Sequence, residues 1–347
     1  MIRVGASALH LVPGRAPALR VQRRFMPGDE TALAASDIEE VTRDMLFSDH
    51  RDQLVASGHV EVLYIARSGV RFRATISEAG GQCSLVFRPV PETPPRLETL
   101  DLPEQVGAFA RCRSGFVAVA GFFGSGKTTT LAALVGALNQ DHTRHIVTIE
   151  DAIEFVHPNG AALLHQREIG SHVQSAAQGI RQAVAAGIDA IVVSEIHDAE
   201  TLDAAITAAE SGCLVLGGVE AGSVVGAIAG MCQLVPLEQR PRVRTRLSRA
   251  LRGVTAQSLL QRSHKSGRIA VVEILVGNPA ARTVIRRGQL QDLQGIMQRC
   301  RGLGMQTADI ALRGLLSRHL VTQEEALLHA VDRDEVLART GTPAGVR

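Results

Sequence analysis

The sequence has 347 residues, of which 45% are hydrophobic and 21% charged, and this composition is typical of a soluble protein large enough for two domains. A formal net charge of +2 does not indicate a nucleic-acid partner, and we expect none. No apolar run approaches the roughly 20 residues that span a bilayer. His10, Pro13 and Arg15 interrupt the first apolar residues, so we expect neither a membrane span nor a cleaved signal. Five scattered cysteines without a C-x-x-C pair argue against a zinc site or a disulfide framework and favour a cytoplasmic protein.

The N-terminal part shows short β-rich runs that alternate with turns, namely ALHLV, ALRV, VEVLYIAR, VRFRATI and SLVFRPV. A helix is expected over Ala35–Leu46, with Ser36 as its N-cap. The stretch Pro89–Pro103 is proline-rich and acidic, as is typical of a linker between domains. We therefore predict a small α+β domain with its linker over residues 1–95.

Residues 104–288 alternate between strands and helices. The β-rich runs GFVAVA, HIVTI, AIVVS, LVLGG and IAVVEIL are separated by helical segments. Such alternation predicts an α/β domain with a mainly parallel sheet that helices cover on both faces. From residue 289 to residue 347 the pattern is helical and polar, which predicts a C-terminal helical region.

A glycine-rich loop follows the first strand of this α/β domain. GFFGSGKT at residues 121–128 fits G-x-x-x-x-G-K-[ST], between an apolar strand and a helical segment. Its glycines allow a tight turn that aims backbone N–H groups at phosphate, and the following helix presents its positive end to the same anion. A glycine-rich turn without a ligand is the alternative, which the order of strand, loop, Lys-Thr pair and helix disfavours. We predict that ATP is bound by Gly121, Gly124, Ser125, Gly126, Lys127, Thr128 and Thr129.

Hydrolysis needs carboxylates near this loop, one for a metal ion and one for water. The run HIVTIEDAIEFVH contains Glu154, and an apolar strand leads to Glu195 in IVVSEIHDAE. A carboxylate at the carboxyl end of a strand is well placed to bind Mg²⁺ together with the Thr128 hydroxyl. For Glu154 and Glu195 we favour a catalytic role over a solvated charge. For Asp198 and Glu200 we favour ordinary charges at a helix start.

Several motifs occur in the order and at the spacing of one known family. GFFGSGKTTTLAAL, VTIEDAIEFVH, QREIG, IVVSEIHDAETLDAAITAAESGCLVLG and GMQTAD together resemble the PilT family of hexameric motor ATPases that retract type IV pili. The resemblance extends from about Gly5 to about Gln323 and implies a RecA-like P-loop ATPase domain behind a PAS-like N-terminal domain. GMQT at Gly304–Thr307 and the segment Pro279–Leu290 resemble the retraction branch more than the assembly and secretion branches.

The resemblance also implies roles for individual residues. Glu154 matches the carboxylate that acts as general base, and Glu195 matches the Walker B acid that orients water or Mg²⁺. Arginines of the N-terminal domain act in the family as fingers on a neighbouring subunit's nucleotide. The candidates are Arg71, Arg73 and Arg88, each of which is equally consistent with an exposed charge at a sheet edge.

By the same resemblance, the partners are five further copies of the chain in a homohexamer, an inner-membrane pilus platform protein and a paralogous motor ATPase. Such a motor is cytoplasmic and becomes peripheral to the inner membrane through the pilus machine.

One departure from the family lies after the strand LVLGG. A box that resembles GTLHTNSA in relatives reads GGVEAGSV here, with Glu220 at the position of the histidine. An ionised carboxylate cannot donate a hydrogen bond to phosphate as an imidazole can. Glu220 therefore points away from the phosphate, meets it through Mg²⁺, or impairs the sensing of ATP. Ile188, His197 and Ala185 are smaller departures.

A second charged feature is the run Glu238–Gly253, which contains six arginines. A nucleic-acid or membrane surface is one reading of such a run. Spacing near four residues places several of the arginines on one helix face, so we favour a solvated or subunit-facing surface.

Three functions follow from these features. The first is a hexameric motor ATPase that couples ATP hydrolysis to pilus retraction and twitching motility, on its own or as an accessory paralogue of the PilT and PilU type. The second is a weakly or non-hydrolysing ATP-binding subunit that regulates a pilus motor. The third is a secretion-system traffic ATPase.

Overall fold

A computed structural model describes residues 1–21, 24–28, 31–90, 93–264 and 267–337. The chain forms two compact units, one of Met1–Thr93 with Glu154–Val156, and one of Pro94–Ile153 with His157–Arg347. The predicted boundaries at residues 95, 104 and 288 remain predictions. Residues 338–347 of the predicted C-terminal region lie outside the described residues.

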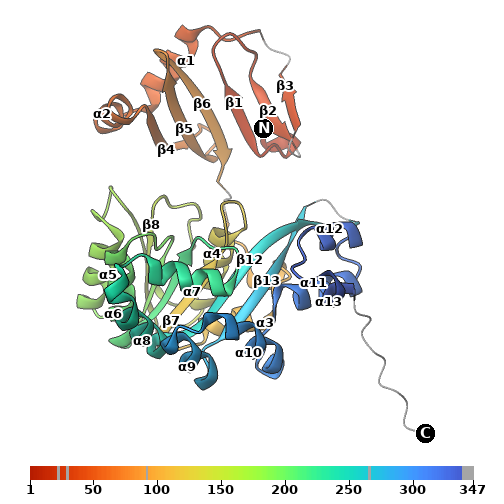
Figure 1. Cartoon of the computed structure of the whole chain (residues 1–347). Coiled ribbons are helices and arrows are strands. Elements are labelled where there is room, and N and C mark those ends of the chain that lie inside the picture. Colours follow the sequence, from red (N-terminus) through yellow and green to blue (C-terminus); the bar gives the residue numbers. More distant parts are fainter. Residues whose placement is uncertain (22–23, 29–30, 91–92, 265–266, 338–347) are drawn as a thin grey trace. The chain divides into compact units, whose positions relative to one another are not determined.

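The first unit is an antiparallel sheet of six strands in the order β3-β2-β1-β6-β5-β4, together with two helices (Figure 1). A short 3₁₀ helix, η1 (Ile2–Val4), precedes the sheet. The elements are β1 (Ala8–Leu11), β2 (Ala18–Val21), β3 (Arg24–Pro27), α1 (Ala35–Met45), α2 (Ser48–Ser57), β4 (His59–Ile65), β5 (Arg71–Ala79) and β6 (Gln82–Pro89).

The core of the first unit lies on one face of its sheet. Val60 and Val62 of β4 are buried, whereas Glu61 and Leu63 between and after them are exposed. Such alternation is typical of an antiparallel strand with one solvated face. The buried face packs against α1 and α2 through one cluster, which includes Ile38, Leu46, Leu54, Val60, Ile76 and Leu85.

Helix α1 begins two residues earlier than an N-cap at Ser36 would place it. Ala34 is the N-cap, and its backbone N–H donates to Asp37 Oδ2 at 2.8 Å. The expectation of a Ser36 cap was therefore wrong, because Ser36 already lies in the first turn and the Asp37 carboxylate binds back to the cap residue.

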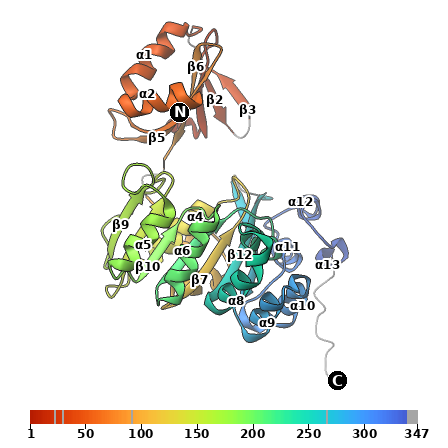
Figure 2. The ribbon, with the colours of Figure 1, turned by 60° about the vertical axis from the view of Figure 1, so that its left-hand side comes forward.

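The second unit has a sheet of seven strands in the order β13-β12-β7-β11-β10-β8-β9, in which only β13 runs antiparallel to its neighbour (Figures 1 and 2). The strands are β7 (Gly115–Ala120), β8 (His145–Glu150), β9 (Leu163–Glu168), β10 (Ala190–Val193), β11 (Leu214–Val219), β12 (Leu251–Gln261) and β13 (Arg268–Val276).

Helices connect these strands and continue to the end of the described chain. The α-helices are α3 (Glu104–Ala110), α4 (Lys127–Leu138), α5 (Ala176–Ala185), α6 (Ala199–Glu210), α7 (Val224–Gln233), α8 (Arg240–Ala250), α9 (Pro279–Arg287), α10 (Leu293–Arg299), α11 (Ala308–Ser317), α12 (Gln323–Leu328) and α13 (Arg333–Leu337). Short 3₁₀ helices are η2 (Leu97–Thr99), η3 (Leu237–Gln239), η4 (Leu290–Asp292) and η5 (Arg301–Leu303). Within the described residues, no helix is long and apolar enough to cross a membrane.

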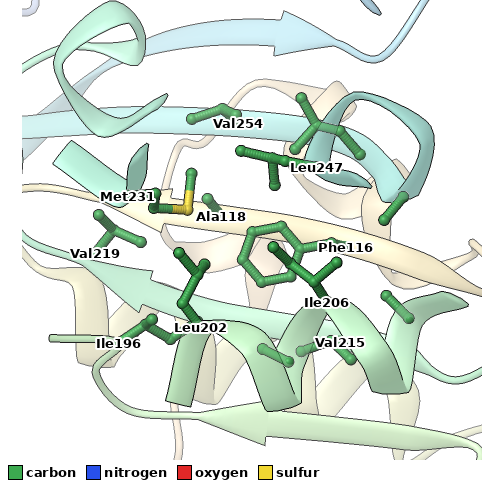
Figure 3. Packing of buried hydrophobic residues seen from close by; sticks show 14 of the residues in the cluster. Phe116, Ala118, Ile196, Leu202, Ile206, Val215, Val219, Met231, Leu247 and Val254 are labelled. Atoms are coloured by element: carbon green, nitrogen blue, oxygen red, sulfur yellow. The ribbon is translucent and has the colours of Figure 1, made fainter. Parts of the chain in front are cut away.

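Strand β7 is buried on both faces. Phe116 and Ala118 point into a cluster that includes residues of α5 to α9, whereas Val117 and Val119 point into a cluster with α3 and α4. Figure 3 shows the ring of Phe116 near Leu202 and Ile206 of α6 and Leu247 of α8. Burial on both faces explains why this strand is a continuous apolar run, and it fixes the loop that follows at the carboxyl edge of the sheet.

One arginine of helix α8 differs from the expectation of a solvated or subunit-facing surface. Arg246 forms ion pairs with Asp203 and Glu210 of α6, and only 18% of its side chain is exposed. Hydrogen bonds to Glu210 are the main cause that raises the pKa of Arg246. Burial lowers this pKa, and the hydrogen bond to Asp203 raises it further. Arg246 therefore joins two helices of the same chain.

Candidate nucleotide-binding site

The phosphate loop connects β7 to α4, and glycines determine its shape. Gly124 and Gly126 have φ angles of 77° and 90°, in the left-handed region that other residues adopt only at a cost. A Cβ at Gly121 would lie 2.1 Å from the Ser125 hydroxyl oxygen. Glycine is thus required at residues 124 and 126 by the backbone conformation and at residue 121 by close packing.

Helix α4 presents an uncapped N-terminus to this loop. The N-cap residue is Gly126, and no side chain accepts a hydrogen bond there. The first N–H groups of a helix have no partner within the helix, and together with the helix dipole they favour an anion. Lys127 and Thr128 are the first two residues of the helix, so their side chains extend from the same end.

Lys127 and Glu195 meet at the carboxyl edge of the sheet. Lys127 Nζ lies 3.1 Å from Glu195 Oε1, and the two side chains are 11% and 30% exposed. Glu195 follows the end of β10 by two residues. The next backbone N–H, that of Ile196, donates to Gly218 O of β11 at 2.8 Å. The structure therefore brings together the ammonium group predicted to bind phosphate and the carboxylate predicted to bind metal.

The two acidic residues at the end of β8, Glu150 and Asp151, accept hydrogen bonds from neighbouring residues. Glu150 Oε1 accepts hydrogen bonds from Thr148 Oγ1 at 2.6 Å and from Gln166 Nε2 at 3.1 Å. The Ser194 hydroxyl, beside Glu195, donates to Asp151 Oδ2 at 2.7 Å. The Glu150 bonds lie within β8 and between β8 and β9, whereas the bond from Ser194 to Asp151 holds the ends of β8 and β10 together directly before Glu195.

The side chain of Gln257 in β12 forms hydrogen bonds that support the phosphate loop. These bonds were not predicted from the sequence. Its Nε2 donates to the backbone oxygen of Ser125 at 2.9 Å, and its Oε1 accepts from the Thr130 hydroxyl at 2.9 Å. Gln257 is 5% exposed, so both bonds are shielded from water. Arg268 of β13 adds a bond from Nη1 to Gly124 O at 3.3 Å. A glutamine inside the β-rich run GVTAQSLL was the available signal.

The arginine candidates belong to the first unit. Arg71 and Arg73 lie in β5, and Arg88 of β6 is directly opposite Arg73 in the register. Buried Ala74 and Ile76 alternate with the two arginines of β5, so these arginines lie on the sheet face opposite to the core.

The segment Glu154–Val156 belongs to the same unit as these arginines. Within that unit, Arg73 Nη2 lies 3.2 Å from Glu154 Oε1, and Arg73 Nε lies 3.3 Å from Glu61 Oε1. One guanidinium group is therefore paired with two carboxylates, one of which is the candidate general base.

Comparison with known proteins assigns the chain to a family. Residues 102–325 match the family described as Type II/IV secretion system protein. The chain is 35% identical over 326 residues to the type IV pilus retraction ATPase PilT of Pseudomonas aeruginosa, with 93% of each chain covered. It is 32% identical over 330 residues to the type IV pilus ATPase PilU of the same organism, covering 95% of this chain and 86% of the relative.

This chain belongs to the family of PilT-type pilus ATPases.

The fold agrees with that assignment. The crystal structure of the pilus retraction motor PilT with bound ADP superposes with a TM-score of 0.86, at 33% identity and with 96% of each chain covered. The ATPase DotB of Legionella pneumophila, at 23% identity, shares the fold with a TM-score of 0.80 over 94% of this chain and 92% of its own. The predicted α/β class is confirmed, with a P-loop ATPase domain, a smaller α+β domain before it and a helical C-terminal region.

Glu220, predicted from the sequence to stand at the family's histidine position, lies in a short loop between β11 and α7. Glu220 is exposed and Ala221 after it is buried. Ser223 then caps α7 by accepting from Gly226 N at 3.0 Å, and Val224 N donates to Glu273 Oε2 at 2.6 Å. Burial is the main cause that raises the pKa of Glu273. The loop is therefore anchored at its helix end, next to the exposed carboxylate.

Two further acids of this PilT-type chain have structural roles. Asp198 caps α6, since its carboxylate accepts hydrogen bonds from the Thr201 backbone N–H at 2.8 Å and from the Thr201 hydroxyl at 2.6 Å. Burial of Asp198 opposes ionisation, but these hydrogen bonds hold its pKa below the usual range. Glu200 accepts from Arg181 Nη1 at 2.7 Å. Both residues occupy the first turn region of α6, as expected of charges at a helix start.

Proposed function

We propose that this PilT-type ATPase is a motor subunit that binds and hydrolyses ATP to drive retraction of type IV pili. The observation that supports this most directly is the pairing of Lys127 with Glu195 at 3.1 Å, next to a loop whose Gly121 has no room for a Cβ. A loop of this shape fits phosphate, and the pair supplies the cation and the carboxylate that a bound magnesium nucleotide requires.

ATP would be bound through the loop and the start of α4. In this proposal the N–H groups of Gly124 and of residues 126–129 face the phosphates, because those of Gly121 and Ser125 already donate to Val219 O and Phe122 O. Lys127 Nζ contacts the β- and γ-phosphates. Thr128 Oγ1 and Glu195 would hold Mg²⁺, since this ion is commonly bound by one or two protein oxygens together with phosphates and water. Bound Mg²⁺ would supply neutralisation of charge on the leaving phosphate oxygens.

Glu154 would act as the general base in the hydrolytic step. Its carboxylate takes a proton from water as the water oxygen attacks the γ-phosphorus, and the bond from that phosphorus to the β–γ bridging oxygen breaks. ADP and inorganic phosphate are the products. Arg71, Arg73 and Arg88 are the candidates to stabilise the charge on the transferred group, from a neighbouring subunit.

The proposed assembly is a cytoplasmic homohexamer at the inner membrane. Its partners would be a pilus platform protein in that membrane and a paralogous motor ATPase. If arginine fingers act between subunits, hydrolysis depends on the assembled ring, so activity should rise more steeply than linearly with protein concentration.

A second candidate function is that of an ATP-binding subunit that regulates another motor and hydrolyses little ATP itself. The exposed Glu220 favours it, because an ionised carboxylate replaces a group able to donate a hydrogen bond to phosphate.

ATP hydrolysis by the assembled protein tests the two candidates against each other. We expect a rate that Lys127→Ala abolishes by preventing binding, and that Glu154→Gln lowers by about 10²–10⁴-fold while binding is retained. Binding of ATP without a rate above that of Lys127→Ala would contradict the motor and favour the regulatory subunit.

A further inference from the structure

The phosphate loop has two aromatic side chains at its tip. Phe122 is 61% exposed and Phe123 is 95% exposed. Large exposed apolar side chains on a loop that is predicted to bind a polar nucleotide call for an explanation. The two rings differ in surroundings, because Phe122 lies close to Gly222 of another loop whereas Phe123 is almost fully exposed.

The ring of Phe122 lies against the backbone of Gly222. A Cβ added at Gly222 would be 2.7 Å from Phe122 Cε2, 3.4 Å from Cζ and 3.6 Å from Cδ2. Gly222 is not among the residues with positive φ, so its own backbone does not require glycine. The need for glycine at this position arises from the close approach of the ring.

Gly222 lies in the loop that contains Glu220, and both ends of this loop are anchored. At the strand end, the Gly121 N–H donates to Val219 O at 3.1 Å. At the helix end, Ser223 caps α7. Between these anchors, Phe122 is the phosphate-loop side chain that packs against the loop.

We propose that Phe122 is a positioning residue that, through Gly222, keeps the Glu220 carboxylate turned to solvent and away from the nucleotide phosphates. This inference rests on the proposed binding of ATP at the phosphate loop. A carboxylate that reached a triphosphate would oppose binding by like-charge repulsion. Because the Phe122 ring packs against the backbone of Gly222, two residues after Glu220, it limits how far the loop between β11 and α7 can move toward the phosphates. Glu220 is then tolerated in a working site because of Phe122.

The contact itself can be tested without nucleotide. The chain contains no tryptophan, so Phe122→Trp introduces a single indole. Adding Gly222→Ala should displace that ring, shift its emission to longer wavelength and increase its quenching by acrylamide. Phe123→Trp is the matched control, because its exposed ring should show the same emission with and without Gly222→Ala. Equal responses of the two probes to Gly222→Ala would overturn the contact.

The effect on Glu220 is tested by a double-mutant cycle on binding of a non-hydrolysable ATP analogue with Mg²⁺, measured by calorimetry. Phe122→Ala should weaken binding by at least about twofold, the lower range expected for residues that interact. In a Glu220→Gln background the same substitution should have no such effect, because no charge remains to approach the phosphates. Additive effects, or unchanged binding in Phe122→Ala, would overturn the positioning role.

The two experiments separate this inference from the proposed function. If neither the parent chain nor any variant binds the analogue, the proposal that ATP binds at this loop is wrong. The positioning role of Phe122 is then wrong as well. The tryptophan probes would still decide whether Phe122 packs on Gly222.

Discussion

The sheet of the second unit is packed with apolar clusters on both faces, whereas the sheet of the first unit is packed on one face by α1 and α2. Strand β7 is buried throughout, and strand β4 alternates between buried and exposed residues. A strand buried on both faces tolerates polar side chains only where they find partners. Polar exceptions in the second sheet, such as Gln257, therefore indicate a specific task, whereas polar residues on the first sheet carry less information.

The comparison predicts that the same substitution has very different effects in the two units. Phe116→Ala in β7 removes a fully buried ring and should lower the free energy of unfolding by about 3–5 kcal/mol. Phe25→Ala in β3 removes a ring that is 59% exposed and contacts His10 and Arg20, and should cost about 0.5–1 kcal/mol. Denaturant unfolding measures both, and similar losses would contradict the contrast between the sheets.

A smaller effect is expected from the polar exception in the second sheet. Gln257→Leu removes the partner of Ser125 O and of the Thr130 hydroxyl, and should cost about 1–3 kcal/mol of stability. Binding of ATP should weaken as well, because the phosphate loop loses its support. Gln261→Leu is the control, since the Gln261 side chain on the same strand is exposed. Equal stability and affinity of the two variants would show that Gln257 does not support the loop.

A third effect concerns pH. Burial lowers the pKa of His157 in the second unit to about 4, from an ordinary value of 6.5. The unfolded chain therefore binds more protons between these values, and the free energy of unfolding should fall as the pH falls from about 7 to about 4. His157→Gln should reduce this dependence, as measured by denaturant unfolding at several pH values.

The matched control for the pH dependence lies in the first unit. Burial, with Arg20 and Arg88 nearby, also lowers the pKa of His10 in the first unit. His10→Gln should change the pH dependence in the same direction but by less. A larger change at His10 than at His157 would reverse the comparison of the two units.

Local features of the chain were sufficient to predict five strands of the second unit, β7, β8, β10, β11 and β13, and the loop between β7 and α4, whereas β9 and β12 were not predicted. The apolar runs GFVAVA and LVLGG lie within the buried strands β7 and β11. Glu195 was correctly expected just beyond a strand, because β10 ends at Val193. These predictions depended on residues close together in sequence, where strand burial and turn chemistry leave direct traces.

What could not be predicted depends on neighbours that are distant in sequence. Gln257 contacts Thr130 because β12 pairs with β7, and the residues of neither segment indicate that these two strands are neighbours. The pairing of Arg246 with Glu210 likewise follows from the packing of α8 on α6. The contact of Phe122 with Gly222 was hidden because neither residue is unusual by itself.

The hairpin of β12 and β13 has a consequence for exchanging parts between related chains. Gln257 of this hairpin supports the phosphate loop. Farther along the hairpin, Leu260, Ile269 and Val271 pack in one cluster with three residues of the C-terminal region, Leu312, Leu315 and Val321. A chimera that takes its C-terminal helices from a paralogue would leave a foreign surface against the hairpin. The functional crossover point for such a chimera therefore lies before Leu251, so that hairpin and helices are inherited together.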